Sequence, residues 1–294
     1  MSSFARGLDL LLQQLRSFEE GDRPRFDQSV IDRIHRLALQ LAEESWNAEE
    51  APVQNARPEP AERVAEELVQ PDSVGAGVRK EESEKRLAAL WETVSVCTKC
   101  TRLAEFRHTV VFGVGNPSAD LMFVGEAPGA DEDLRGEPFV GKAGELLTRI
   151  IETMGFERSS VYIANVLKCR PDMPKGSSGN RPPTPEEMQT CLPYLRSQIE
   201  IIQPKVMVAL GGVAMKGLFG TSEPMKSLRG RWHSFGNIPV MATFHPSYLL
   251  RNQALSEKRK VWEDMLQVLE RLGAPISERQ RNFFLGKPGS PANS

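Results

Sequence analysis

Four short apolar runs, each ending abruptly in a glycine, asparagine or histidine motif, constrain the fold of this chain more than any other feature. They occupy residues 121–124, 161–164, 206–210 and 240–244, and a helical segment usually follows. Short strands that alternate with helices predict an α/β fold with a parallel sheet and helices on both faces. The motifs then gather at the carboxyl edge of the sheet, where open α/β sheets hold their ligands.

The composition is that of a globular protein. Of the 294 residues, 40% are hydrophobic and 26% are charged. No apolar run approaches the length that crosses a membrane, and the first residues lack a cleavage-like site. We therefore expect no signal peptide, no membrane contact and a cytoplasmic location. Cysteines stay reduced there, which favours metal binding or catalysis over disulfides.

The net charge of −2 conceals an asymmetry along the chain. Residues 1–90 carry 12 Lys and Arg against 18 Asp and Glu, whereas residues 91–294 carry 25 against 21. A mildly basic C-terminal part is compatible with a nucleic-acid partner, although many enzymes share this balance.

Composition divides the chain into four parts. Residues 1–46 form a helical N-terminal extension with two amphipathic helices, and residues 47–80, rich in Ala, Glu, Pro and Val, form a flexible linker. Residues 81–273 are the expected main domain, and residues 274–294 are a loose tail. Two helices make a poor core alone, so we expect the extension to dock on the main domain, pair with another chain or bind a protein partner.

The chain has four cysteines, in a spacing that suggests a metal site. Cys97 and Cys100 form a tight pair, whereas Cys169 and Cys191 are separated by 21 residues. A structural zinc site usually supplies its second half as another tight pair, and iron–sulfur clusters tolerate scattered ligands. Spacing alone leaves three readings open, namely an iron–sulfur cluster, a zinc ion and buried free thiols.

Five motifs taken together resemble a known family, the family-four or iron–sulfur uracil-DNA glycosylases. They are residues 125–129 (GEAPG), 132–133 (ED), 136–144 (GEPFVGKAG), 165–171 (NVLKCRP) and 245–251 (HPSYLLR). The resemblance includes the order of the motifs and all four cysteines. It covers roughly residues 87–273 and leaves residues 1–80 outside.

The resemblance implies a three-layer α/β/α fold with a short, mainly parallel four-stranded sheet. It also implies a [4Fe-4S] cluster on Cys97, Cys100, Cys169 and Cys191, with zinc as the alternative. The implied activity is removal of uracil from DNA by hydrolysis of the N-glycosidic bond, which leaves an abasic site. We expect a monomer without a lyase step, because no amine nucleophile is prominent in the motifs. Residues 1–80 should be dispensable for base excision.

Two other functions stay open at this point. One is a glycosylase of the same fold with a shifted preference for other deaminated bases. The other is a DNA-binding or polymerase-associated accessory module that keeps the fold without turnover.

Recognition of a flipped uracil needs a surface on which the base stacks and a group that forms hydrogen bonds with its polar edge. Phe139 is the candidate stacking platform, with a core phenylalanine as the alternative. The amide of Asn165 offers an acceptor for uracil N3–H and a donor for O4, and its alternative reading is a turn former. Backbone N–H groups of Glu126 and Ala127 are expected to contact the base as well.

Cleavage of the glycosidic bond places negative charge on the departing base and positive charge on the sugar. His245 is the candidate donor to uracil O2, and a neutral imidazole suffices for this. Glu132, in the acidic triplet 131–133, is the candidate that orients water and offsets the cationic sugar.

The segment after His245 is expected to contact DNA. We predict DNA contacts for Ser247, Leu249 and Arg251, with Leu249 or Leu250 as a wedge into the gap left by the flipped base. The alternative for the two leucines is a buried helix start.

A cysteine substitution tests the cluster. We expect Cys169→Ala to lose the brown chromophore of the protein and much of its thermal stability, because one ligand of four is removed. Visible absorption, iron content and a melting curve measure this. A colourless, fully folded wild type with bound zinc contradicts the cluster assignment.

Overall fold

Six strands form the sheet at the centre of the fold, in the order β1-β3-β2-β4-β6-β5. The computed structural model describes residues 72–171 and 179–285. The strands are β1 (Val114–Gly115), β2 (Leu121–Gly125), β3 (Tyr162–Asn165), β4 (Val206–Leu210), β5 (Trp232–Phe235) and β6 (Ile238–Thr243). The four inner strands run parallel, whereas β1 and β5 are antiparallel edges.

The four predicted strands are therefore confirmed, but the expected four-stranded sheet is wrong in its edges. β1 has only two residues, so its sequence carries almost no periodicity. β5 and β6 form a hairpin with Gly236 and Asn237 between them, and Gly236 has a φ of +58°. The apolar run that indicated β6 began only at residue 240, because the turn-proximal part of that hairpin is half-exposed.

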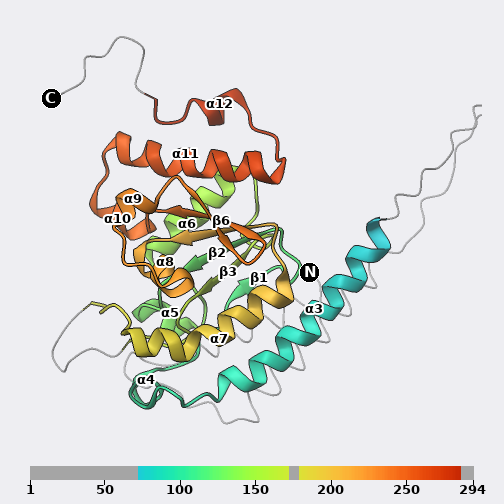
Figure 1. The fold of residues 1–294 in the computed structure, drawn as a ribbon, viewed down its shortest axis with the longest axis vertical. Coiled ribbons are helices and arrows are strands. Elements are labelled where there is room, and N and C mark those ends of the chain that lie inside the picture. Colours follow the sequence, from blue (N-terminus) through green and yellow to red (C-terminus); the bar gives the residue numbers. More distant parts are fainter. Residues whose placement is uncertain (1–71, 172–178, 286–294) are drawn as a thin grey trace, which may run out of the picture. The chain divides into compact units, whose positions relative to one another are not determined.

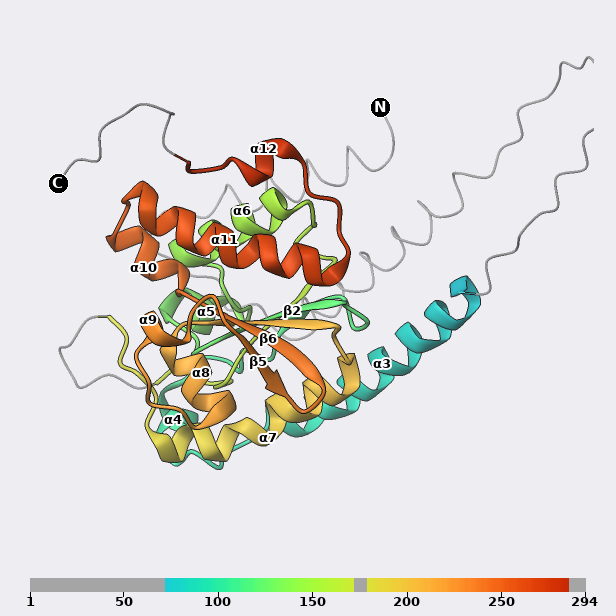
Figure 2. The same cartoon turned by 45° about the horizontal axis from the view of Figure 1, so that its top comes forward.

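Helices cover both faces of the sheet, as Figures 1 and 2 show. One face packs on α3 (Asp72–Ser95), α4 (Thr101–Phe106), α7 (Pro185–Ile202) and α8 (Gly212–Phe219). The other packs on α6 (Lys142–Met154) and α11 (Leu255–Leu272). The two-residue period of a strand explains this division. In β2, Met122 and Val124 belong to the first core, while Leu121 and Phe123 belong to the second.

Two short helices follow strands at their carboxyl ends, namely α5 (Ala130–Arg135) after β2 and α10 (Pro246–Arg251) after β6. Two others are α9 (Met225–Leu228), between α8 and β5, and α12 (Glu278–Arg281), near the end of the described chain. The start of α7 is defined by a capping box between Thr184 and Glu187, with Pro185 at the first helical position. No helix in the described ranges is both long and apolar enough to span a membrane.

Both ends of the expected main domain extend further than the sequence indicated. α3 begins at Asp72, inside the stretch predicted as a linker. The stretch predicted as a loose tail contains α12, and the indole N–H of Trp262 donates to the Gln280 carbonyl at 2.5 Å. The predictions for residues 1–46, for 47–71 and for 286–294 lie outside the described residues.

Arg79 and Ser83 attach α3 to the carboxyl end of α7. The Arg79 guanidinium donates to the carbonyls of Ile202 and Gln203, at 3.0 and 3.1 Å, and the Ser83 hydroxyl donates to Ile201 O at 3.2 Å. Those carbonyls have no intrahelical partner at the helix end. α3 accordingly belongs to the same compact unit as the rest of the described chain.

Two shortened chains test this boundary. A chain that begins at Val69 should melt within a few degrees of the full chain. A chain that begins at Glu81 should lose about 1–2 kcal/mol, because hydrogen bonds from a charged donor are removed. Arg79→Ala in the full chain is the matched point variant and should reproduce most of that loss in thermal unfolding. If the chain that begins at Glu81 and the Arg79→Ala variant were both as stable as the full chain, the role of Arg79 would be contradicted.

Candidate active site

A cleft of about 960 Å³ opens at the carboxyl ends of the parallel strands. Its lining includes Glu126 after β2, Asn165 at the end of β3, Gly211 after β4 and His245 after β6. β3 lies on one side of β2, and β4, the next strand along the chain, lies on the other side. The strand order therefore reverses at β2, which makes this position a topological switch point of the sheet. The prediction that the motifs gather at one edge is confirmed.

Phe139 lies against the cleft in a constrained position. Its side chain is buried, and its backbone has a φ of +55°, which residues other than glycine rarely adopt. A Cβ at Gly125 would lie 2.5 Å from Cζ of this ring, and a Cβ at Gly144 would overlap the Phe139 carbonyl. Gly125 therefore makes room for the Phe139 ring, and Gly144 makes room for the Phe139 backbone.

Asn165 places an unpaired acceptor beside that ring. The residue is 2% exposed, and its Oδ1 has no hydrogen-bond partner in the structure. A buried amide oxygen without a partner costs roughly 1–3 kcal/mol, so such groups call for an explanation. A Cβ at Gly125 would collide with this same oxygen. The acceptor and the aromatic ring thus both occupy the space that a side chain at Gly125 would take.

His245 lies close to the Phe139 ring, with 5.6 Å between ring centroids. The backbone N–H of Ser247 donates to Nδ1 at 3.1 Å, and the Ser247 hydroxyl lies 2.8 Å from the same nitrogen. Burial, and next the charge of Arg251, lower the pKa of this imidazole to about 4. The ring is therefore neutral near pH 7, and because Nδ1 accepts, its proton is on Nε2.

The three acids of the triplet have different environments. Glu132 lines the cleft, and its carboxylate accepts the backbone N–H groups of Gly129, Val140 and Gly141 at 3.1–3.3 Å. Asp133 is buried and accepts from the backbone of His108, whose Nδ1 lies 2.7 Å away. Asp131 lines the cleft and is exposed.

The four cysteine side chains line one small cavity, called the cysteine cavity below. The guanidinium of Arg107 donates to Cys169 Sγ at 3.2 Å, the Tyr194 hydroxyl donates to Cys97 Sγ at 3.2 Å, and the backbone N–H of Lys168 donates to Cys191 Sγ at 3.3 Å. Donors of this kind stabilise metal-bound thiolates.

The chemistry of the four thiols is compatible with the expected cluster, although the described residues show no cofactor directly. Burial raises the pKa of the Cys100, Cys169 and Cys191 thiols, the last to about 11, so a metal has to displace their protons. Within the described ranges, no group of three or more His, Cys, Asp or Glu side chains is arranged to hold one metal ion. A cluster spreads its ligands over several irons, and four thiols around a shared cavity suit that arrangement.

Comparison with known proteins identifies the family. The model of the uracil DNA glycosylase superfamily matches residues 112–266, more than half of the chain. This chain belongs to the uracil-DNA glycosylase superfamily. The resemblance inferred from the motifs is confirmed, and the matched residues include every strand of the sheet and the cleft-lining His245.

Several curated members of the superfamily are similar over most of their own length. A type-4 uracil-DNA glycosylase of Thermotoga maritima is 45% identical over 186 residues, which are 62% of this chain and 92% of the relative. One of Sulfurisphaera tokodaii is 40% identical over 209 residues, 68% and 90% of the two chains. A type-5 enzyme of Pyrobaculum aerophilum is 31% identical over 212 residues, 60% and 88%.

The two leucines of the predicted DNA-contact segment have different surroundings in this superfamily member. Leu249 is buried in a small cluster with Phe244 and Val261, whereas its neighbour Leu250 is 36% exposed. This burial favours the alternative of a buried helix start for Leu249, and the DNA contacts of this segment stay predictions. Ser247 and Arg251 line the cleft. Helix periodicity alone could not separate two adjacent leucines, because a short helix gives too few turns.

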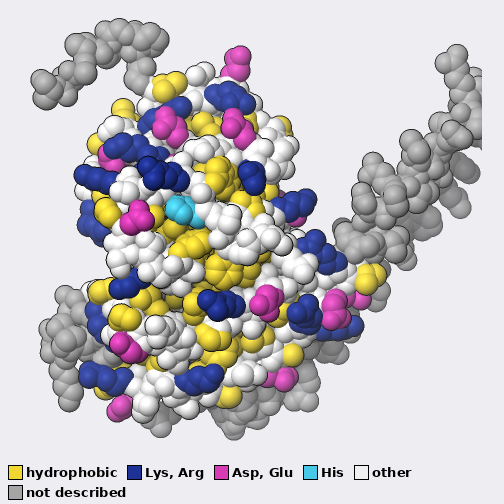
Figure 3. Space-filling view, in the orientation of Figure 1, with side chains coloured by type: hydrophobic (Ala, Val, Ile, Leu, Met, Phe, Trp, Pro, Cys, Tyr) yellow, Lys and Arg dark blue, Asp and Glu magenta, His cyan; other side chains and the backbone are white. Residues whose placement is uncertain are grey.

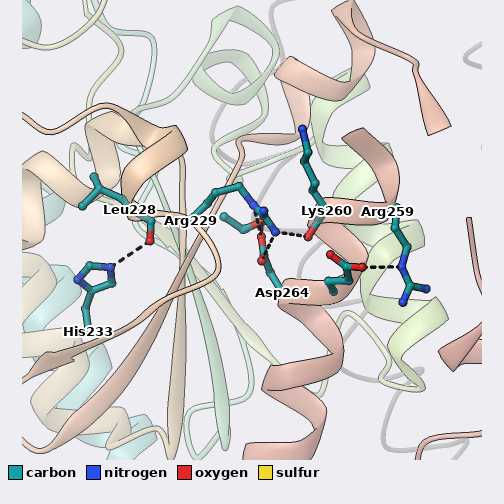
Figure 4. Close-up of polar contacts among 8 residues, drawn as sticks. Leu228, Arg229, His233, Arg259, Lys260 and Asp264 are labelled. Atoms are coloured by element: carbon teal, nitrogen blue, oxygen red, sulfur yellow. Dashed lines mark hydrogen bonds and ion pairs between the residues drawn. The ribbon is translucent and has the colours of Figure 1, made fainter. Parts of the chain in front are cut away.

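A buried ion pair that the sequence did not indicate holds the strand before His245. Asp264 of α11 is fully buried, accepts the Thr243 hydroxyl at 2.7 Å and pairs with Arg229, which also donates to the Lys260 carbonyl (Figure 4). Burial raises the pKa of Asp264 to about 6, although the bonds from Thr243 and Arg229 oppose this. The strand end that carries His245 is thereby joined to α11.

Charged side chains of both signs are interspersed on the face of the molecule in Figure 3, and hydrophobic side chains gather toward its middle. Charged side chains of both signs also line the cleft. The cations are Lys142, Arg170, Arg181, Lys216 and Arg251, and the acids are Glu126, Asp131, Glu132 and Glu223. The basic side chains are available to a phosphate-bearing ligand.

Proposed function

We propose that this chain is a type-4 uracil-DNA glycosylase, which removes uracil from DNA by hydrolysis of the N-glycosidic bond and leaves an abasic site. The observation that carries the proposal is the unpaired Asn165 Oδ1, buried between the Phe139 ring and the strand β2. The type-4 relatives are more similar to this chain than the type-5 relative, at 45% and 40% against 31% identity.

The amide of Asn165 selects the base. Uracil presents N3–H to Oδ1 and O4 to the amide NH₂, so both groups are satisfied when the base enters. Cytosine presents an acceptor and a donor in the opposite places, and leaves buried polar groups unpaired. Stacking on Phe139 adds about 1–3 kcal/mol for any base, so it contributes affinity and not selectivity.

His245 stabilises the leaving group. The Nε2–H of the neutral ring donates to uracil O2, and this bond strengthens as the base becomes an anion. Ser247 orients the ring through Nδ1, since its N–H and hydroxyl both lie within hydrogen-bond distance. Backbone N–H groups of Glu126 and Ala127, at the end of β2, add contacts to the base.

Glu132 orients the attacking water and offsets the charge of the sugar. Three backbone N–H groups hold its carboxylate at the wall of the cleft, which fixes the group without a cationic partner. These bonds also join the start of α5 to the segment that carries Phe139. A change at Glu132 therefore affects both the water and the stacking ring.

DNA lies along the basic side chains of the cleft. Arg251 contacts a phosphate, Ser247 a neighbouring backbone group, and the exposed Leu250 enters the space of the flipped nucleotide. Cys97, Cys100, Cys169 and Cys191 would hold a [4Fe-4S] cluster, which would join the segment before α4, the segment after β3 and α7.

A cleavage assay on two matched oligonucleotides tests the function. One carries a single uracil and the other thymine at that position, and alkali with heat reveals abasic sites. We expect cleavage of the uracil strand only. His245→Ala should lower the rate about 10²–10³-fold, as for loss of one oxyanion donor. Asn165→Asp should lower it about tenfold to a hundredfold, because an acceptor replaces the donor to O4.

The same assay without alkali checks for strand breakage. Lys142 and Lys216 line the cleft, so breakage without alkali would reveal a lyase step. A brown, folded protein that leaves the uracil strand intact would overturn the proposal, and a panel of other deaminated bases would come next.

The pH profile tests the protonation state of His245. Its pKa of about 4 means that the neutral ring persists above that pH and is lost as pH falls through it. Single-turnover excision should therefore stay level from about pH 8 to about pH 5, where an unshifted histidine is already protonated. A decline centred near pH 6.5 would contradict this.

Glu126 needs a control in that experiment, since burial raises the pKa of its carboxyl in the same cleft. If the protonation of His245 causes the loss of excision rate at low pH, Glu126→Gln should show that loss at the same pH as wild type.

A further inference from the structure

Lys168 is a buried cation between the cleft and the cysteine cavity. Its side chain is 1% exposed, and its Nζ donates to the Asn165 carbonyl at 2.9 Å and to Gln198 Oε1 at 2.5 Å. Its own backbone N–H donates to Cys191 Sγ. One residue thus touches both the strand end that reads the base and a ligand of the expected cluster.

The surroundings of Lys168 lack a carboxylate partner. Among the ion pairs of residues 72–171 and 179–285, none joins Lys168 to an acidic side chain. The groups that would be anionic beside it, once a metal displaces their protons, are the sulfurs of Cys169, its neighbour in sequence, and Cys191 of α7. A buried ammonium needs such an anion, because burial without one is strongly unfavourable.

Gln198 completes the connection to α7. It follows Cys191 by seven residues, which is two helical turns, and its amide NH₂ donates to Phe112 O and to the Tyr162 hydroxyl. Lys168 therefore bonds to both ends of one rigid helical segment. The helix and the cluster ligands together determine where its ammonium lies.

We propose that Lys168 is a positioning residue that couples the iron–sulfur cluster to the uracil pocket through the Asn165 carbonyl. The inference rests on the proposed function, since it concerns the same base and the same cluster. A cluster on these cysteines would supply negative charge beside the Lys168 ammonium, and the ammonium holds the main chain of Asn165.

The position of the Asn165 amide depends on that main chain. No protein group binds its Oδ1, so the side chain has no partner at that atom to orient it. The backbone is held by its register opposite Gly125, by the Val166 N–H bond to Gly125 O at 3.0 Å, and by the Lys168 ammonium. Loss of the ammonium removes one of these three restraints.

Two DNA probes measure the coupling in the full-length, iron-loaded protein. One carries a non-hydrolysable 2′-fluoro-2′-deoxyuridine, and the other a tetrahydrofuran abasic analogue at the same position. The ratio of their Kd values, from fluorescence anisotropy, isolates the contribution of the base. Lys168→Met removes the ammonium, and Tyr162→Phe is the matched control, because it removes a bond of the same buried network without touching Lys168.

We expect Lys168→Met to reduce the base-dependent ratio about tenfold, as for one disturbed buried hydrogen bond, with the abasic Kd within about twofold of wild type. Tyr162→Phe should leave the ratio within about twofold. In an Asn165→Ala background, Lys168→Met should have almost no further effect on the ratio, because both act through one amide.

Iron release gives a second readout. If cluster and pocket are coupled, the uracil analogue DNA should slow chelator-driven bleaching of the cluster more than abasic DNA does, in wild type and in Tyr162→Phe but not in Lys168→Met. Lys168→Gln, which is neutral but polar, replaces Lys168→Met if that variant does not fold.

Three outcomes overturn the inference. The first is an unchanged ratio of Kd values in an iron-loaded Lys168 variant. The second is that Lys168→Met reduces this ratio in the Asn165→Ala background as much as in the wild-type background. The third is that Tyr162→Phe reduces the ratio as much as Lys168→Met does. Failure of the proposed function is a separate result, because wild type would then show no preference between the two probes and no excision.

Discussion

The parallel register of β2 and β3 is the constraint on which the rest of this site depends. It sets Gly125 opposite Asn165, so a residue without a side chain faces the amide that we propose to read the base. The room left by that glycine admits both the Phe139 ring and the Asn165 oxygen. The hydrogen-bond ladder of the sheet thus determines the dimensions of the base pocket, since strand spacing is nearly invariant.

Buried polar groups connect this edge of the sheet to the helices beneath it. Asp264 of α11 binds Thr243, two residues before His245, and Lys168 binds the carbonyl of Asn165 while contacting Cys191 of α7. Each pocket residue is therefore held from a different helical layer. Buried pairs of this kind contribute little net stability, but they specify one arrangement of the groups that they join.

The parallel strands and the position of the cleft could be predicted from the sequence, because strands and turns have local sequence patterns. Four apolar runs predicted the four parallel strands, and the motifs after them predicted the cleft, since the carboxyl ends of parallel strands meet at one edge. The edge strands β1 and β5 were missed because one has two residues and the other is half-exposed on one side of a hairpin.

Local motifs were enough to predict the family, the order of the strands along the chain and the residue types available at each strand end. Which of those residues act together depends on how the chain packs. The tertiary structure buried Leu249 and exposed Leu250, gave Glu132 three backbone donors, and enclosed Lys168 between the cleft and the cysteine cavity. Burial and hydrogen bonding join residues that are far apart in the chain, as Asp264 and Thr243 are, and periodicity along the sequence carries no record of such partners.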